Sequence, residues 1–130
     1  MQNRQFKPGF RLSVIDVFVL LLGLAAVFVY LKSVPQFSAI IFFVVLHFFL
    51  FCNLVRMSRL PELLWASLFL MFCLASLRFD LLPFYMVFIL SAIFSVLLIL
   101  FETRKKSYHG IYWQALNPDL RSWFESTDKD

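Results

Sequence analysis

The chain has 130 residues, of which 62% are hydrophobic and 15% charged, and its mean hydropathy is +0.83. A water-soluble globule of this size needs more polar surface than this composition provides, so a soluble domain is excluded. The sequence indicates an all-α integral membrane protein, because the backbone polar groups of long apolar runs in lipid must pair within helices.

Four apolar runs approach the length of about 20 residues that a helix needs to cross a bilayer. We predict helical spans at about residues 13–31, 37–56, 61–79 and 81–102. Together they form a four-transmembrane-helix bundle over residues 13–106. A basic N-terminal segment, residues 1–12, precedes the bundle, and a tail, residues 107–130, follows it.

Local signals predict where these helices begin. Ser13 and Asp16 have the spacing of a capping box, which places the first helix start near Ser13. Pro61 suits the first turn of the third helix, where its missing N–H is not needed. Asp80 is the expected N-cap of the fourth helix, with Pro83 in the first turn.

Lys and Arg are distributed unequally between the two ends of the predicted bundle. Only two of the twelve, Lys32 and Arg78, lie at one end. The other ten are Arg4, Lys7, Arg11, Arg56, Arg59, Arg104, Lys105, Lys106, Arg121 and Lys129. Because short loops rich in Lys and Arg remain in the cytoplasm, both termini should be cytoplasmic, and a bacterial inner membrane is the expected location.

The tail keeps aromatic residues at helical spacing, and Asn117-Pro118-Asp119 resembles the start of a new helix. We predict two short amphipathic helices with apolar faces formed by Tyr108, Ile111, Tyr112 and Ala115, and by Leu120, Trp123 and Phe124. Residues 126–130 should be disordered. The tail then lies on lipid headgroups or folds on a partner protein.

Polar residues within the spans are costly and therefore candidates for function. His47 should lie near the midplane at the depth of Ser91, so we predict that the two form an intramembrane polar pin by hydrogen bonding. Haem or quinone ligation and an ion path are the alternatives. A buried haem needs a second axial ligand, and His109, the other histidine, lies outside the fourth span, so no cofactor is expected.

Two further residue types within the spans are expected to have packing or interfacial roles. Cys52 and Cys73 differ in height by about 10 Å, which exceeds the reach of a disulfide, so both are expected to pack as small apolar residues. Trp65 is expected at the height of an interfacial aromatic belt. We see no metal-ligand set.

The richest polar group lies at the predicted cytoplasmic end and comprises Asp16, Asn53, Arg56, Arg59 and Glu62. Residues three apart share a helix face, so this hairpin is expected to carry an ion-pair network that closes onto Asp16. The hypothesis is a docking site for lipid phosphate or a partner, since paired guanidinium groups bind phosphate oxygens bidentately. A solvated surface patch is the alternative.

No acid and base pair or activated nucleophile is apparent, so an enzyme is not expected. The favoured interpretation is a small multi-pass accessory or interaction protein that docks on a larger membrane complex or on anionic lipid. A small oligomeric transporter or channel with His47 on its path, or a haem- or quinone-binding subunit, are the alternatives. The expected partners are the bilayer and a membrane protein or a second copy of the chain, not a nucleic acid.

Overall fold

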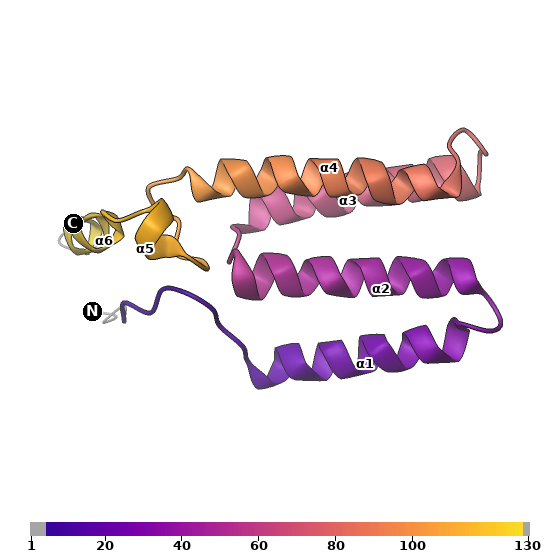
Figure 1. The fold of residues 1–130 in the computed structure, drawn as a ribbon, viewed down its shortest axis with the longest axis horizontal. Helices are drawn as coiled ribbons and strands as arrows, with labels where there is room; N and C mark the ends of the chain where they lie inside the picture. Colours follow the sequence, from indigo (N-terminus) through magenta and orange to yellow (C-terminus); the bar gives the residue numbers. More distant parts are fainter. Residues whose placement is uncertain (1–4, 129–130) are drawn as a thin grey trace.

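The computed structural model describes residues 5–128, and within that range it contains helices and loops but no strands. Four long helices lie side by side: α1 (Val14–Tyr30), α2 (Pro35–Phe49), α3 (Arg59–Leu77) and α4 (Phe84–Thr103) (Figure 1). A π-helical turn, η1 (Leu50–Leu54), continues α2, and the short helices α5 (Trp113–Leu116) and α6 (Leu120–Thr127) follow α4. Arg4 and Lys129, which contribute to the predicted charge asymmetry, lie outside the described residues.

Three helical segments are long and apolar enough to cross a membrane, namely Pro35–Leu54, Arg59–Leu77 and Phe84–Thr103. α1 is also apolar but has 17 residues. At 1.5 Å per residue it is about 25 Å long, against a hydrocarbon core of about 30 Å. The fold is therefore all-helical over the described range, with membrane-spanning character in three of its four long helices.

The predicted start of the first helix is confirmed. The Ser13 hydroxyl accepts a hydrogen bond from the backbone N–H of Asp16 at 3.2 Å, and the Asp16 carboxylate accepts one from the Ser13 backbone N–H at 2.8 Å. This reciprocal arrangement satisfies two N–H groups at the helix start. Pro61 lies in the first turn of α3, as predicted.

The predicted start of the fourth helix is wrong. Asp80 has a left-handed backbone (φ +53°) and belongs to the loop, and α4 begins at Phe84 directly after Pro83. The residue before a proline is disfavoured in the helical conformation, so Leu82 interrupts any helix that starts at Leu81. Leu81 instead donates its N–H to the Ala75 carbonyl at 2.9 Å, and this hydrogen bond attaches the loop to the last turn of α3.

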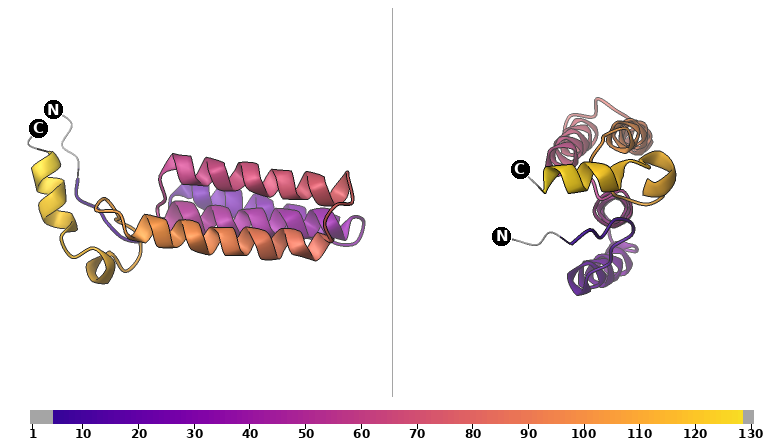
Figure 2. Two further views of the ribbon diagram at one scale, coloured as in Figure 1. Left: turned by 90° about the horizontal axis from the view of Figure 1, so that it is seen from above. Right: turned by 90° about the vertical axis from the view of Figure 1, so that its left-hand side faces the viewer.

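α2 lies between α1 and the α3–α4 pair (Figure 2), and it packs differently on its two sides. Toward α1 the approach is close, because Gly23 leaves no room for a Cβ beside Val45, and the Ser38 hydroxyl donates to the Val27 carbonyl at 2.9 Å. Toward α3 and α4 the contact is made by large side chains, and the buried core consists of Phe51, Trp65, Phe69, Cys73 and Val87. No residue of α1 is fully buried, so α1 is the outermost of the four helices.

The tail differs in part from the prediction. Residues 108–112 do not form a helix, and Tyr112 has a left-handed backbone (φ +55°). α6 follows Asn117-Pro118-Asp119 as predicted, and it continues to Thr127, so the expected disorder at residues 126 and 127 is wrong. Residues 129–130 lie outside the described residues.

Candidate functional site between the terminal segments

α2 ends in a π turn, which alters where its last carbonyl groups point. Val55 donates its N–H to the Leu50 carbonyl at 2.9 Å, five residues back, and Met57 donates to the Phe51 carbonyl at 2.8 Å. The wider turn leaves the carbonyls of Asn53 and Leu54 without partners in their own helix. Each accepts a hydrogen bond from a terminal segment of the chain instead.

The N-terminal segment is held by Asn53. Its carbonyl accepts from the Arg11 N–H at 3.2 Å. Its side chain is buried (1% exposed), and with the amide nitrogen facing these acceptors it donates to the Arg11 carbonyl and, at 2.9 Å, to the Asp16 carboxylate. Asn53 and Asp16 are thus brought together as predicted, by a hydrogen bond that fixes the chain entering α1.

Arg56 holds the same segment further toward its beginning. Its backbone is left-handed (φ +51°), which turns the chain out of the helix, and its guanidinium donates to the Lys7 carbonyl at 2.6 Å. Among the described residues it forms no ion pair with a carboxylate. Burial and the nearby charge of Arg11 lower the pKa of the Arg56 guanidinium. Arg56 is therefore a half-buried cation whose charge lacks a counterion in the described chain.

The C-terminal tail is attached to the same turn. Ile111 donates its N–H to the Leu54 carbonyl at 2.7 Å, and Gly110 fits because any Cβ would collide with the Val55 carbonyl. The Tyr108 hydroxyl, whose pKa is raised by burial and by Glu102, donates to the Ile111 carbonyl at 2.7 Å. Since Gly9 also donates to the His109 carbonyl at 2.7 Å, the two terminal segments contact each other as well as the turn.

The predicted ion-pair network does not form, because Arg56 turns toward Lys7 and the carboxylates have other partners. Glu62 accepts from the Cys52 thiol at 3.4 Å, and Arg59 is exposed, with no ion pair among the described residues. The buried carboxylate is Glu102 (6% exposed), which was not among the residues predicted for this site. It accepts from the Ser58 N–H at 3.3 Å and from Lys105 at 2.7 Å, which ties the end of α4 to the start of α3.

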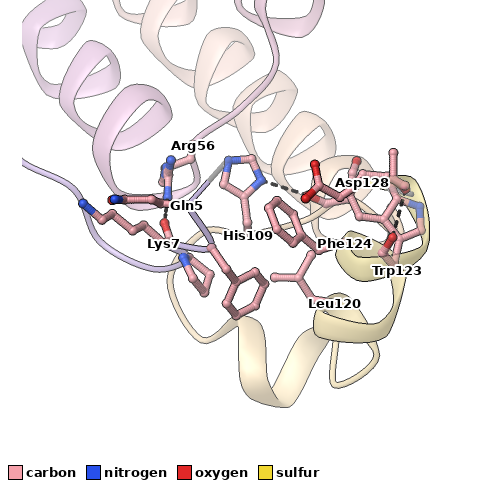
Figure 3. A pocket seen from close by; sticks show the side chains of 12 residues that line it. Gln5, Lys7, Arg56, His109, Leu120, Trp123, Phe124 and Asp128 are labelled. Atoms are coloured by element: carbon pink, nitrogen blue, oxygen red, sulfur yellow. Dashed lines mark hydrogen bonds between the residues drawn. The ribbon is translucent and has the colours of Figure 1, made fainter. Parts of the chain in front are cut away.

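A pocket of about 390 Å³ lies between the terminal segments (Figure 3). Arg56 and Lys7 lie on one side of it, Leu120, Phe124 and Trp123 lie on the other, and His109 stands between them. The loop after the π turn supplies Arg56, the N-terminal segment supplies Lys7, and α6 supplies the apolar wall. The apolar face predicted for residues 120, 123 and 124 thus lines this pocket.

The predicted hydrogen bond between His47 and Ser91 is not formed. His47 is buried and stacks on Trp65 at 4.7 Å between ring centres, and its Nδ1 lies 2.8 Å from the Phe43 carbonyl of its own helix. The Ser91 hydroxyl is buried without a hydrogen-bond partner. The bond between helices is formed instead by Trp65, whose indole N–H donates to the Ser95 hydroxyl at 2.7 Å. Trp65 is therefore a core residue and not a member of an interfacial belt.

Other candidate chemistry has no support in the described part of the chain. Cys52 and Cys73 are free cysteines, and Cys73 packs in the core as predicted. No group of three His, Cys, Asp or Glu side chains within residues 5–128 is placed to hold a metal ion. Comparison with protein-family models, curated proteins and solved structures finds no match.

Proposed function

We propose that this protein is a non-enzymatic accessory protein of a bacterial inner membrane that docks its cytoplasmic end on anionic lipid headgroups. The observation that carries the proposal is a difference in the charged groups of the long helices and their flanking loops at the end where the termini meet: the acidic side chains Asp16, Glu62 and Glu102 accept hydrogen bonds within the protein, while the basic side chains other than Arg56 are exposed. The exposed groups that would contact lipid form a basic ring made of Arg11, Arg59, Arg104 and Lys106.

The three acidic residues nearest this end of the long helices each accept a hydrogen bond from another group of the protein. Asp16 accepts from Ser13, Glu62 from Cys52, and Glu102 from Lys105. The basic ring therefore faces outward with no ion pair to a carboxylate of the described chain. A cation near an anionic membrane surface contributes on the order of 1 kcal/mol, so four such groups support a stable preference for anionic lipid.

Of the residues first proposed for docking, Arg59 keeps this role in the proposal. Arg56, Asn53, Asp16 and Glu62 are engaged inside the protein, and they support the docking surface by fixing its shape. The contacts of His47 with aromatic rings and a main-chain carbonyl favour a structural role over an ion path or haem ligation. A transporter, channel or redox subunit is therefore the less supported alternative.

Lipid retention measured by native mass spectrometry of the detergent-extracted protein tests the proposal. We expect the wild type to retain phosphatidylglycerol in preference to phosphatidylcholine. The double variant Arg59→Gln, Arg104→Gln should lose this preference by about tenfold or more, at roughly 1 kcal/mol per charge.

The matched control is Lys32→Gln, Arg78→Gln, which removes two charges from the opposite end. It should retain phosphatidylglycerol like the wild type. Equal retention by both double variants would contradict the proposal. Loss of a co-purifying protein without loss of lipid would move the docking role to a protein partner.

A further inference from the structure

We infer that the pocket between the terminal segments binds an anionic amphiphile of the bilayer, with a carboxylate or phosphate headgroup beside Arg56 and Lys7 and an apolar chain against α6. This inference goes beyond docking on a lipid surface and does not use the basic ring. It concerns one ligand bound in a pocket, while the basic ring concerns the surrounding bilayer. The two can therefore fail independently.

The two sides of the pocket have different chemistry. Figure 3 places Arg56 and Lys7 on one side, where the Lys7 side chain extends outward from the pocket, and Leu120, Phe124 and Trp123 on the other. A ligand that satisfies both sides must carry a polar anionic end and an apolar body. Soluble anions would leave the apolar wall exposed to water, and neutral lipids would leave Arg56 without a counterion.

The charge of Arg56 is the strongest argument for an anion. Its guanidinium is half-buried, and the hydrogen bond that it makes is to the neutral carbonyl of Lys7. A buried or partly buried cation is stabilised by an anion, and none of the described carboxylates pairs with it. Asp128 also lines the pocket, but it lies beside Trp123 across from Arg56, and two cations outnumber it.

The walls are held in place by contacts independent of any ligand. The ring of Phe6 packs edge-to-face on Trp113, with 5.7 Å between ring centres, and against Phe124, with 5.3 Å between ring centres. These contacts join the N-terminal segment to both tail helices. The volume of about 390 Å³ falls within the roughly 300–1,000 Å³ of ligand pockets. The site is thus formed before the ligand arrives and has the size for a single acyl chain rather than a whole two-chain lipid.

Photo-crosslinking of the full chain in phosphatidylcholine nanodiscs tests this assignment. The probes are a fatty acid with a diazirine in its acyl chain and the alcohol of the same chain length. We expect the fatty acid to label residues 120–127 at least tenfold more than the alcohol does. Inorganic phosphate should not compete, whereas an unlabelled fatty acid should.

Lys7→Gln is the main variant, because the Arg56 bond uses the main-chain oxygen of residue 7 and survives the substitution. It should reduce labelling of residues 120–127 by roughly threefold to tenfold, as expected for removal of one complementary charge at a binding site. The matched control is Arg121→Gln, which removes an exposed cation of α6 outside the pocket lining and should leave labelling unchanged. Trp123→Ala should also reduce labelling, because it removes part of the apolar wall.

Three outcomes would overturn the inference. Labelling confined to the membrane helices would show that the pocket holds no acyl chain. Equal labelling by the alcohol would show that the anionic headgroup is not recognised, and equal labelling of wild type and Lys7→Gln would remove the role of the cationic side. None of these outcomes depends on the Arg59 and Arg104 variants, so lipid docking and pocket binding are distinguished.

Discussion

Asn53 joins the π turn to the N-terminal segment through both its main chain and its side chain. Its carbonyl and its side-chain amide both bond to the main chain of Arg11, and the amide also reaches the Asp16 carboxylate. At 1% exposure these groups cannot exchange a lost partner for water. A buried polar group left unpaired costs about 1–3 kcal/mol, so loss of this side chain weakens the attachment of the N-terminal segment at Arg11.

Replacing Asn53 by Leu should lower the free energy of unfolding by about 1–3 kcal/mol, because the Asp16 carboxylate and the Arg11 carbonyl lose their donor. Thermal unfolding in a mild detergent measures this change. Gln114→Leu makes the same kind of substitution at an exposed position of the tail and should have little effect. Equal melting temperatures for Asn53→Leu and wild type would show that water replaces the amide.

At the scale of the elements, α2 uses two kinds of packing because its two neighbours differ. Gly23 lets α1 approach α2 closely, as small residues do in membrane helix pairs, and Phe43 and Phe51 keep α2 at a distance from α3. Between α3 and α4 the bond from Trp65 to Ser95 fixes the rotation of both helices. The Ser95 hydroxyl donates in turn to the Ser91 carbonyl at 2.7 Å, so it accepts one hydrogen bond and donates another.

A double-mutant cycle with Trp65→Phe and Ser95→Ala should show coupling between α3 and α4. We expect an interaction energy of about 0.5–2 kcal/mol, the range for hydrogen bonds between membrane helices. Unfolding in mixed micelles provides the four free energies. A cycle of His47→Gln with Ser91→Ala is the control and should give a value near zero, because these side chains do not bond. Coupling in the second cycle and none in the first would restore the predicted pin.

The sequence predicts the four long helices, with η1 counted as part of α2, to within three residues at each end, because hydropathy acts locally, whereas the capping prediction is confirmed at Ser13 and wrong at Asp80. Ser13 and Asp16 are three residues apart, and their pairing can be predicted from that spacing alone. Depth along a helix placed Ser91 level with His47, but depth does not determine rotation about the helix axis, so Trp65 and Ser95 were missed. The bond of Arg56 to Lys7 was not predictable because its acceptor is a main-chain oxygen, which has no sequence signature.

At the scale of the whole molecule, the two terminal segments meet at one end of the long helices (Figures 1 and 2). α1 and α2 run antiparallel beside each other, so α1 extends along the same bundle as the three longer apolar helices. This arrangement favours a fourth crossing, although α1 has only 17 residues, because a short span is tolerated at modest cost when the bilayer thins or flanking residues extend it.

We predict that both termini are cytoplasmic and that α1 crosses the membrane. Reporter fusions after residue 130 and within residues 32–36 should report cytoplasmic and external locations, respectively. A single cysteine at residue 5, in a chain whose Cys52 and Cys73 are replaced, should resist a membrane-impermeant maleimide added from outside. Labelling at residue 5 together with a cytoplasmic C-terminus would reduce the number of crossings to three.

The contact between Gly9 and His109 joins residues a hundred positions apart, and it has a consequence for biosynthesis. During translation the N-terminal segment emerges first, and its partners Asn53 and Arg56 follow directly after α2, whereas His109 is made only after all four long helices. Closure of this end therefore requires a chain complete through Ile111. A chain that ends before His109 lacks both the acceptor for the Gly9 N–H and the donor to the Leu54 carbonyl, so the two terminal segments cannot be joined.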